Sequence, residues 1–168
     1  MRTPLDLEPL LSVLVDHDVD LIVAGGYAVA AHGHIRSTKD IDICPDPADD
    51  NLRRLAAALD QLEAEPIGLV ELAAGESDLL PDLEGLRAGG NWTLMTKHGR
   101  LDVMQHLAGL GGEGGGWAEL AKHAIRRSFL GHACLFCSYE DLIRMKQGAG
   151  RPQDKIDVAN LRAARGEL

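Results

Sequence analysis

The chain has 168 residues, a formal net charge of −9 and 45% hydrophobic residues, which suits one globular domain with a buried core. The negative charge argues against general affinity for nucleic acid, because counterion release requires a dense positive surface. The longest apolar runs, such as 21–24 and 28–31, fall far short of the ~20 residues of a membrane span, and the N-terminus is too acidic for a signal peptide. We therefore expect one cytoplasmic domain over residues 1–168.

The first part of the chain predicts alternating helices and strands. Leucines at helical spacing predict a helix over 9–16, DLIVAGG predicts a short buried strand stopped by glycines, and YAVAAHG predicts an alanine-rich helix ended by Gly33. The stretch KDIDICP alternates polar and apolar residues, which indicates a strand, and Pro45 closes it. Segment 47–64 is amphipathic with acidic residues in its first turn, and this pattern predicts a helix.

The middle of the chain is less regular. Residues 66–90 are rich in Gly, Pro and acidic residues, and we expect no regular element there. NWTLMTKHG and RLDVMQHL follow as two predicted strands, joined by a tight turn at His98 and Gly99. The low-complexity stretch at 110–116 predicts a flexible loop.

The chain is predicted to be mainly helical from Trp117 onward. One short strand is expected at ACLFC, followed by a helix that Ser138 caps and that runs through Lys146. The sequence GAGRP breaks this helix, and a last helix is predicted over 153–165.

The cysteines and tryptophans are predicted to belong to the core. Three cysteines, Cys44, Cys134 and Cys137, are an odd number that fits a reducing compartment better than a disulfide framework. Without a second CxxC, the CLFC pair is a weak zinc signal. Trp92 and Trp117 are too few to form a stacking platform for single-stranded nucleic acid.

Charge is distributed unevenly along the chain. Residues 1–90 contain 18 acidic and 6 basic residues, whereas residues 91–168 contain 8 acidic and 11 basic ones. The acidic part is either a solvated face or a site for a metal ion or a cationic substrate. In the second case, Lys146, Arg151 and Lys155 in the C-terminal part would face phosphates.

Two aspartates, separated by one isoleucine, lie in the predicted strand at KDIDICP. Residues i and i+2 of a strand point to the same side, so Asp40 and Asp42 project together while Ile41 and Ile43 enter the core. Two neighbouring carboxylates repel unless a cation lies between them, and oxygen ligands of this kind suit Mg²⁺ or Mn²⁺. The alternative is a solvated face on an edge strand.

A pair of glycines precedes the second predicted helix. Gly25 and Gly26 allow close approach to the backbone at a helix N-terminus, whose free N–H groups attract an anion. Together with the two aspartates, these glycines indicate a site for a metal-bound triphosphate.

The stretch VAGGYAVAAHGHIRSTKDIDI resembles the hallmark of the DNA polymerase β-like nucleotidyltransferase superfamily. Within it, the chain is similar to small bacterial nucleotidyltransferases related to the AbiEii-type toxins, which share a later segment like SYEDLIRMKQGAGRPQDKIDVANL. The similarity covers residues 20–45, 98–104 and 138–161. It implies an α/β (α+β) fold, with a mixed sheet flanked by helices and a helical C-terminal segment. We expect the catalytic sheet core in residues 1–110 and the mainly helical part in 117–168.

The resemblance also assigns roles to three carboxylates. Asp40 and Asp42 would be ligands of the metal ion that holds the triphosphate. Asp102, in GRLDVMQ, would be the ligand of a second metal ion and the general base toward the acceptor. The alternative for Asp102 is a surface acid beside a turn.

Basic and polar residues are expected to contact the nucleotide. Arg36, Thr38 and Lys39 precede the strand of Asp40 and are predicted to contact phosphates, although they would equally serve solubility.

Lys146, Arg151 and Asp154 match recurrent positions of the family's C-terminal segment. The two basic side chains would stabilise a pyrophosphate leaving group. Alternatively, Asp154 forms an internal ion pair that docks the last two helices.

Three functions are compatible with these patterns. The first is a metal-dependent nucleotidyltransferase that moves a nucleoside monophosphate from an NTP to an unidentified hydroxyl or amine. The second is a non-catalytic nucleotide-binding partner module of a toxin-antitoxin pair, and the third is a structural domain. The acceptor stays open among a small molecule such as an antibiotic, a protein and a tRNA end, and a protein partner stays open as well.

Overall fold

The computed structural model describes residues 3–67, 71–72, 80–111 and 116–167. The helices are α1 Leu7–Asp16, α2 Gly25–Ala31, α3 Asp49–Gln61, α4 Leu83–Ala88, α5 Trp117–His123, α6 Tyr139–Ala149 and α7 Pro152–Ala164. The strands are β1 Leu21–Ala24, β2 Asp40–Pro45, β3 Glu65–Pro66, β4 Glu71–Leu72, β5 Gly90–Thr96, β6 Gly99–Met104, β7 Ile125–Phe129 and β8 His132–Phe136.

The strands form one mixed sheet. Its order is β3-β5-β6-β2-β1-β8-β7, and β4 pairs with β5 beside this path. The pairs β2–β6 and β1–β8 are parallel, and the other pairs are antiparallel. With α6 and α7 as a helical C-terminal segment, this arrangement confirms the predicted fold class.

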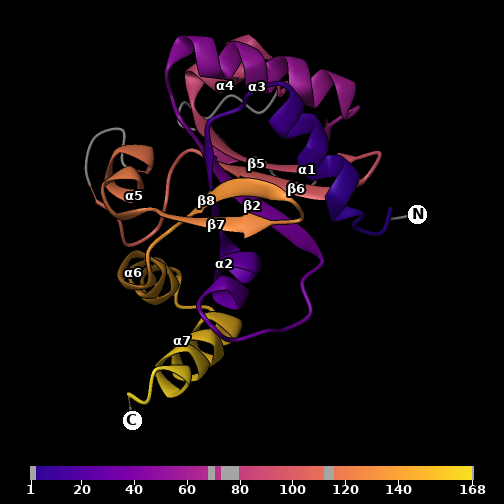
Figure 1. Cartoon of the computed structure of the whole chain (residues 1–168). Helices are drawn as coiled ribbons and strands as arrows, with labels where there is room; N and C mark the ends of the chain where they lie inside the picture. The colour runs from indigo at the N-terminus through magenta and orange to yellow at the C-terminus, as the bar shows by residue number, and fades with distance from the viewer. Residues whose placement is uncertain (1–2, 68–70, 73–79, 112–115, 168) are drawn as a thin grey trace.

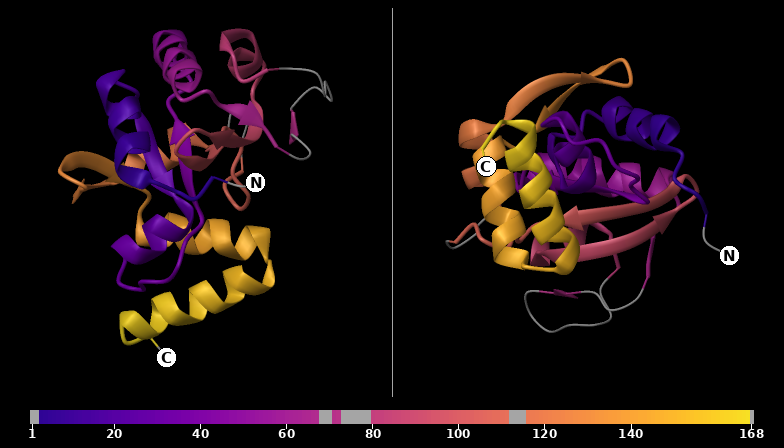
Figure 2. Two further views of the ribbon diagram at one scale, coloured as in Figure 1. Left: turned by 90° about the vertical axis from the view of Figure 1, so that its right-hand side faces the viewer. Right: turned by 90° about the horizontal axis from the view of Figure 1, so that it is seen from below.

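Helices cover both faces of the sheet. Figures 1 and 2 show α1, α3 and α4 on one side and α2, α6 and α7 on the other, with α6 and α7 side by side. The core beneath α3 includes Ile41, Ile43 and Trp92, and the core on the other side includes Phe136 and Leu142. The sheet therefore separates two hydrophobic cores.

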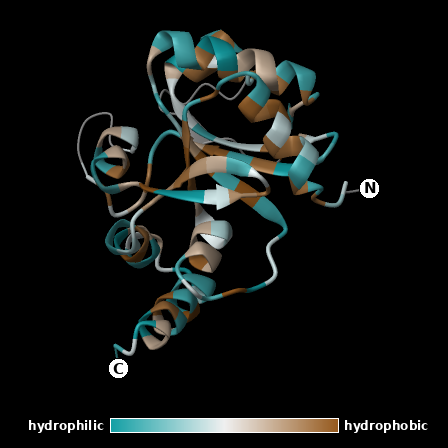
Figure 3. Cartoon of the chain, viewed as in Figure 1, coloured by the Kyte–Doolittle hydropathy of each residue, from teal (hydrophilic) through white to brown (hydrophobic). Residues whose placement is uncertain are grey.

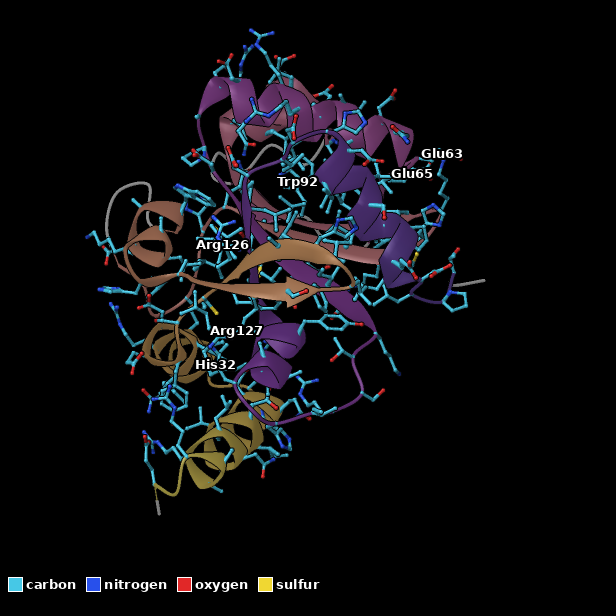
Figure 4. All side chains as sticks on the ribbon, viewed as in Figure 1. His32, Glu63, Glu65, Trp92, Arg126 and Arg127 are labelled. Atoms are coloured by element: carbon cyan, nitrogen blue, oxygen red, sulfur yellow. The ribbon has the colours of Figure 1, made fainter. Side chains whose placement is uncertain are left out.

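The predicted core thiols are confirmed, since the three cysteines Cys44, Cys134 and Cys137 are buried and free. Trp92 (Figure 4) is buried as predicted, whereas Trp117 is only partly buried against the core. None of the helices in the described part of the chain is both long and apolar enough to cross a membrane.

Several boundaries differ from the predictions. Helix α4 lies within the region 66–90 that was expected to be irregular; its N-cap is Asp82, which accepts a hydrogen bond from the Gly85 N–H at 3.0 Å. The turn between β5 and β6 lies at Lys97 and His98, because Thr96 pairs with Gly99. In the loop predicted at 110–116, residues 112–115 lie outside the described residues.

In the C-terminal part, strand β7 was not anticipated, and helix α6 is longer than predicted. Strand β7 was missed because its exposed centre, Arg126 to Ser128, lacks strand alternation. It is an edge strand whose central residues are hydrophilic (Figure 3), and charge on an edge discourages pairing with other chains. Helix α6 continues past Lys146 and ends at Gly150 in a left-handed conformation.

We expect Gly99→Ala to destabilise the fold more than Gly131→Ala. Both glycines have positive φ, +106° and +81°, so an added Cβ is strained at either position. Only at Gly99 would the Cβ also lie 2.5 Å from the Leu5 Cα, whereas Gly131 has open space around it. Denaturant unfolding should show a loss of about 1 kcal/mol for Gly131→Ala and at least about 2 kcal/mol for Gly99→Ala. Equal losses would show that the contact with Leu5 is unimportant.

Candidate active site

Alternation along β2 separates its apolar and acidic side chains. Ile41 and Ile43 are fully buried in the core beneath α3. Asp40 and Asp42 therefore point to the opposite face, toward the C-terminal helices. Both aspartates line a cavity of about 270 Å³ on that face.

Strand β6 adds two charged residues to this face. In the parallel register, Asp40 pairs with Arg100 and Asp42 with Asp102. The four side chains thus occupy the corners of a square on two neighbouring strands. Arg100 donates to both oxygens of Asp102, from Nε at 3.0 Å and from Nη2 at 2.9 Å, and its Nε lies 3.4 Å from Asp40 Oδ2.

The electrostatics of the square favour a cation. Burial, together with the charges of Asp40 and Asp102, raises the pKa of Asp42 to about 7. Burial also raises the pKa of Asp102, although the hydrogen bonds from Arg100 act in the opposite direction. A cation beside Asp40 and Asp42 would remove this repulsion, and their all-oxygen donor set fits a hard divalent ion.

Asp102 is not arranged as a third ligand. Among the residues that the structure describes, no group of three or more His, Cys, Asp or Glu side chains is placed to hold a metal ion. The carboxylate of Asp102 is instead paired with the guanidinium of Arg100. The carboxylates therefore fit one cation at Asp40 and Asp42, and the second metal ion implied by the family does not fit this arrangement.

A network of buried ion pairs forms the opposite wall of the cavity. Lys146 Nζ, on α6, lies 3.1 Å from Asp154 Oδ1 and 2.8 Å from Asp157 Oδ2, both on α7. Arg36 donates to both oxygens of Asp157, at 2.8 and 3.0 Å. The pair of Lys146 and Asp154 joins the last two helices, as the ion-pair alternative predicted. Arg36 links the loop before β2 to the same network, which was not predicted.

Arg151 completes this wall from the start of α7. Its Nε lies 2.7 Å from Asp154 Oδ2, yet the side chain is 73% exposed. Burial acts to raise the pKa of Asp154, but hydrogen bonds from Arg151 and Lys146 lower it overall. With Arg36, the wall holds three cations against two carboxylates, so one positive charge remains beside the cavity.

The two glycines leave room for the side chains of Asp42 and Thr38. A Cβ on Gly25 would lie 1.9 Å from Asp42 Oδ2, and one on Gly26 would lie 2.6 Å from Thr38 Oγ1. Both glycines line the cavity, so an approach to their backbone stays open. Thr38 and Lys39 do not line it, and Lys39 is exposed. Of the three residues predicted to contact phosphates before β2, Arg36 therefore lines the cavity and Thr38 and Lys39 do not.

Sequence reasoning missed Arg100 and Asp157. The signal for Arg100 was its position two residues before Asp102, which places both on one face of a strand. The signal for Asp157 was its position three residues after Asp154, on the same side of a helix.

Several solved structures with a similar arrangement of elements are described as nucleotidyltransferases. No family model matches the chain, and no curated protein is similar to it in sequence. The protein TM1012 from Thermotoga maritima, assigned to the nucleotidyltransferases, is 15% identical with a TM-score of 0.55, over 96% of this chain and 91% of that one.

Two antibiotic-modifying enzymes are similar as well. The lincosamide antibiotic adenylyltransferase LnuA, bound to lincomycin, is 16% identical with a TM-score of 0.58, over 98% of this chain and 99% of its own. ANT(2″)-Ia, in complex with adenylyl-2″-tobramycin, is 18% identical with a TM-score of 0.56, over 90% and 82%. This chain therefore shares the fold of these nucleotidyltransferases. None of the three is described as a toxin, so the AbiEii resemblance stays a prediction.

We expect Asp42→Asn to stabilise the protein in the absence of divalent cations. The pKa of Asp42 is raised in the folded state, so ionisation of this carboxyl costs stability as the pH rises from about 4 to about 7. The amide removes that cost, and the gain should reach about 1–3 kcal/mol at pH 8 and be smallest at pH 4. Thermal unfolding in EDTA measures it, with the exposed Asp60→Asn on α3 as the control. A gain that does not grow with pH would contradict the raised pKa of Asp42 that burial and the neighbouring carboxylates produce.

Proposed function

We propose that the chain is a metal-dependent nucleotidyltransferase that moves a nucleoside monophosphate from an NTP to an acceptor hydroxyl or amine. The observation that carries this proposal is the square of three carboxylates and one arginine on β2 and β6, which faces a cavity with a positive wall. A fold alone does not define an activity, and this combination of charges is what the reaction requires.

The triphosphate is proposed to lie between the square and the wall. Asp40 and Asp42 hold one divalent cation, Mg²⁺ or Mn²⁺, which neutralises both the carboxylates and the phosphate oxygens when bound. Arg36, Lys146 and Arg151 supply the remaining positive charge of the wall. Arg151, the most exposed of the three, is free to turn toward the departing pyrophosphate.

Asp102 is proposed to be the general base. It accepts the proton of the acceptor O–H or N–H as that atom bonds to the α-phosphorus. The bond from the α-phosphorus to its bridging oxygen breaks, and pyrophosphate leaves. Asp102 is only 16% exposed, and this burial favours proton uptake by disfavouring its charged form.

The fold does not identify the acceptor, which has to be found by experiment. LnuA and ANT(2″)-Ia act on antibiotics, which makes lincomycin and tobramycin suitable first probes. Protein and tRNA acceptors remain further candidates. The non-catalytic partner module of a toxin-antitoxin pair predicts nucleotide binding without transfer.

Transfer can be tested with each α-³²P-labelled NTP and Mg²⁺ or Mn²⁺. Reactions contain lincomycin, tobramycin or a fractionated cell extract as the acceptor. We expect label in one acceptor together with release of pyrophosphate, loss of transfer in Asp40→Asn, and normal transfer in Asp60→Asn, which lies on the other side of the sheet. Nucleotide binding without transfer to any acceptor would favour the binding module.

Substitutions of Asp42 and Asp102 should differ in their effects on nucleotide binding and on transfer. Asp42→Asn should weaken both nucleotide binding and transfer, because a ligand of the cation loses its charge. Asp102→Asn should leave nucleotide affinity within a few-fold while slowing transfer by about 10² or more, the usual scale for a lost general base. Calorimetry and single-turnover rates measure the two effects. Transfer at the wild-type rate by Asp102→Asn would rule out this base.

A further inference from the structure

Arg100 is the positively charged member of the square formed with Asp40, Asp42 and Asp102. It is the register partner of Asp40 and precedes Asp102 by two residues, so its side chain reaches both. The paired contacts with Asp102 form the planar fork typical of arginine and carboxylate. Hydrogen bonding to Asp102 raises the pKa of Arg100 further, so the guanidinium stays charged.

This contact competes with divalent cations. Both oxygens of Asp102 already accept hydrogen bonds from Arg100, and a cation bound there would meet a fixed positive charge. The Arg100 side chain is 37% exposed and lines the cavity, so an anion inside the cavity can reach it. A triphosphate offers arginine the same planar, bidentate bonding as a carboxylate, with more negative charge.

We propose that Arg100 is an internal counter-cation that keeps Asp102 paired until a nucleotide binds. The nucleotide-free protein then binds one divalent cation, at Asp40 and Asp42. The triphosphate draws Arg100 away, and Asp102 becomes free to take up a proton or a second cation. This inference rests on the proposed function, and it makes Arg100 a positioning residue for the base. By linkage, nucleotide and second cation strengthen each other's binding.

The test is a Mn²⁺ titration without nucleotide, in which electron paramagnetic resonance measures the free ion. We expect wild type to bind one Mn²⁺ per chain. Arg100→Gln should bind a second Mn²⁺, or bind Mn²⁺ at least about tenfold more tightly, because a fixed positive charge beside the carboxylates of Asp40 and Asp102 is removed. Arg100→Lys should give a smaller gain, because the ammonium keeps the charge but loses the fork.

Two controls separate this contact from a general change in charge. Arg151→Gln removes one positive charge from the same cavity and should change Mn²⁺ affinity by no more than a few-fold, since Arg151 pairs with Asp154 rather than Asp102. The double variant Arg100→Gln/Asp102→Asn should lose the second Mn²⁺ and most of the gain in affinity, because the freed carboxylate of Asp102 is the main source and the contact of Arg100 with Asp40 is longer.

The proposal is overturned if Arg100→Gln binds Mn²⁺ as wild type does, if Arg151→Gln gives the same gain, or if the gain survives removal of Asp102. Should Arg100→Gln fail to fold, Arg100→Lys decides, and wild-type binding by that variant overturns the proposal. None of these measurements requires transfer. The labelled-NTP assay therefore tests the proposed function separately.

Discussion

The parallel pairing of β2 with β6 is the constraint on which the site depends. Its register places Asp42 beside Asp102 and Asp40 beside Arg100, while Ile41 and its neighbours face the core under α3. A slip of one residue would bury the charged set and expose the apolar one. The free energy of core burial therefore enforces a register that brings three carboxylates together, although their mutual repulsion opposes it.

The ion-pair network governs the other half of the cavity. Lys146 and Asp157 are almost completely buried, and such charges are tolerated only when each has a close partner. Lys146 therefore holds α7 against α6, and Arg36 ties the loop before β2 to the same aspartate. This wall of the cavity is thus a structural element of the fold, and among its three cations only Arg151 keeps substantial exposure.

The fold and the residues of the site determine different parts of the proposed function. Identities of 15–18% to solved structures establish the nucleotidyltransferase fold, and the substrate does not follow from them. The proposed chemistry depends on this chain's own residues. Arg100 is where the site departs from the arrangement that the family implies, because a protein cation occupies the carboxylate expected to bind metal.

The sequence by itself determined which side chains share a face, because the strand period of two requires only local geometry. It placed Asp40 with Asp42 and set Asp102 in matching alternation on a second strand. Helix α4 and strand β7 were not predicted, because their sequences show only weak helical or strand periodicity. Only the tertiary structure decided which charges meet: Lys146 with Asp154 and Asp157, and Arg100 with Asp102. Ion pairing between distant segments depends on register and helix packing, which arise from burial across the whole chain.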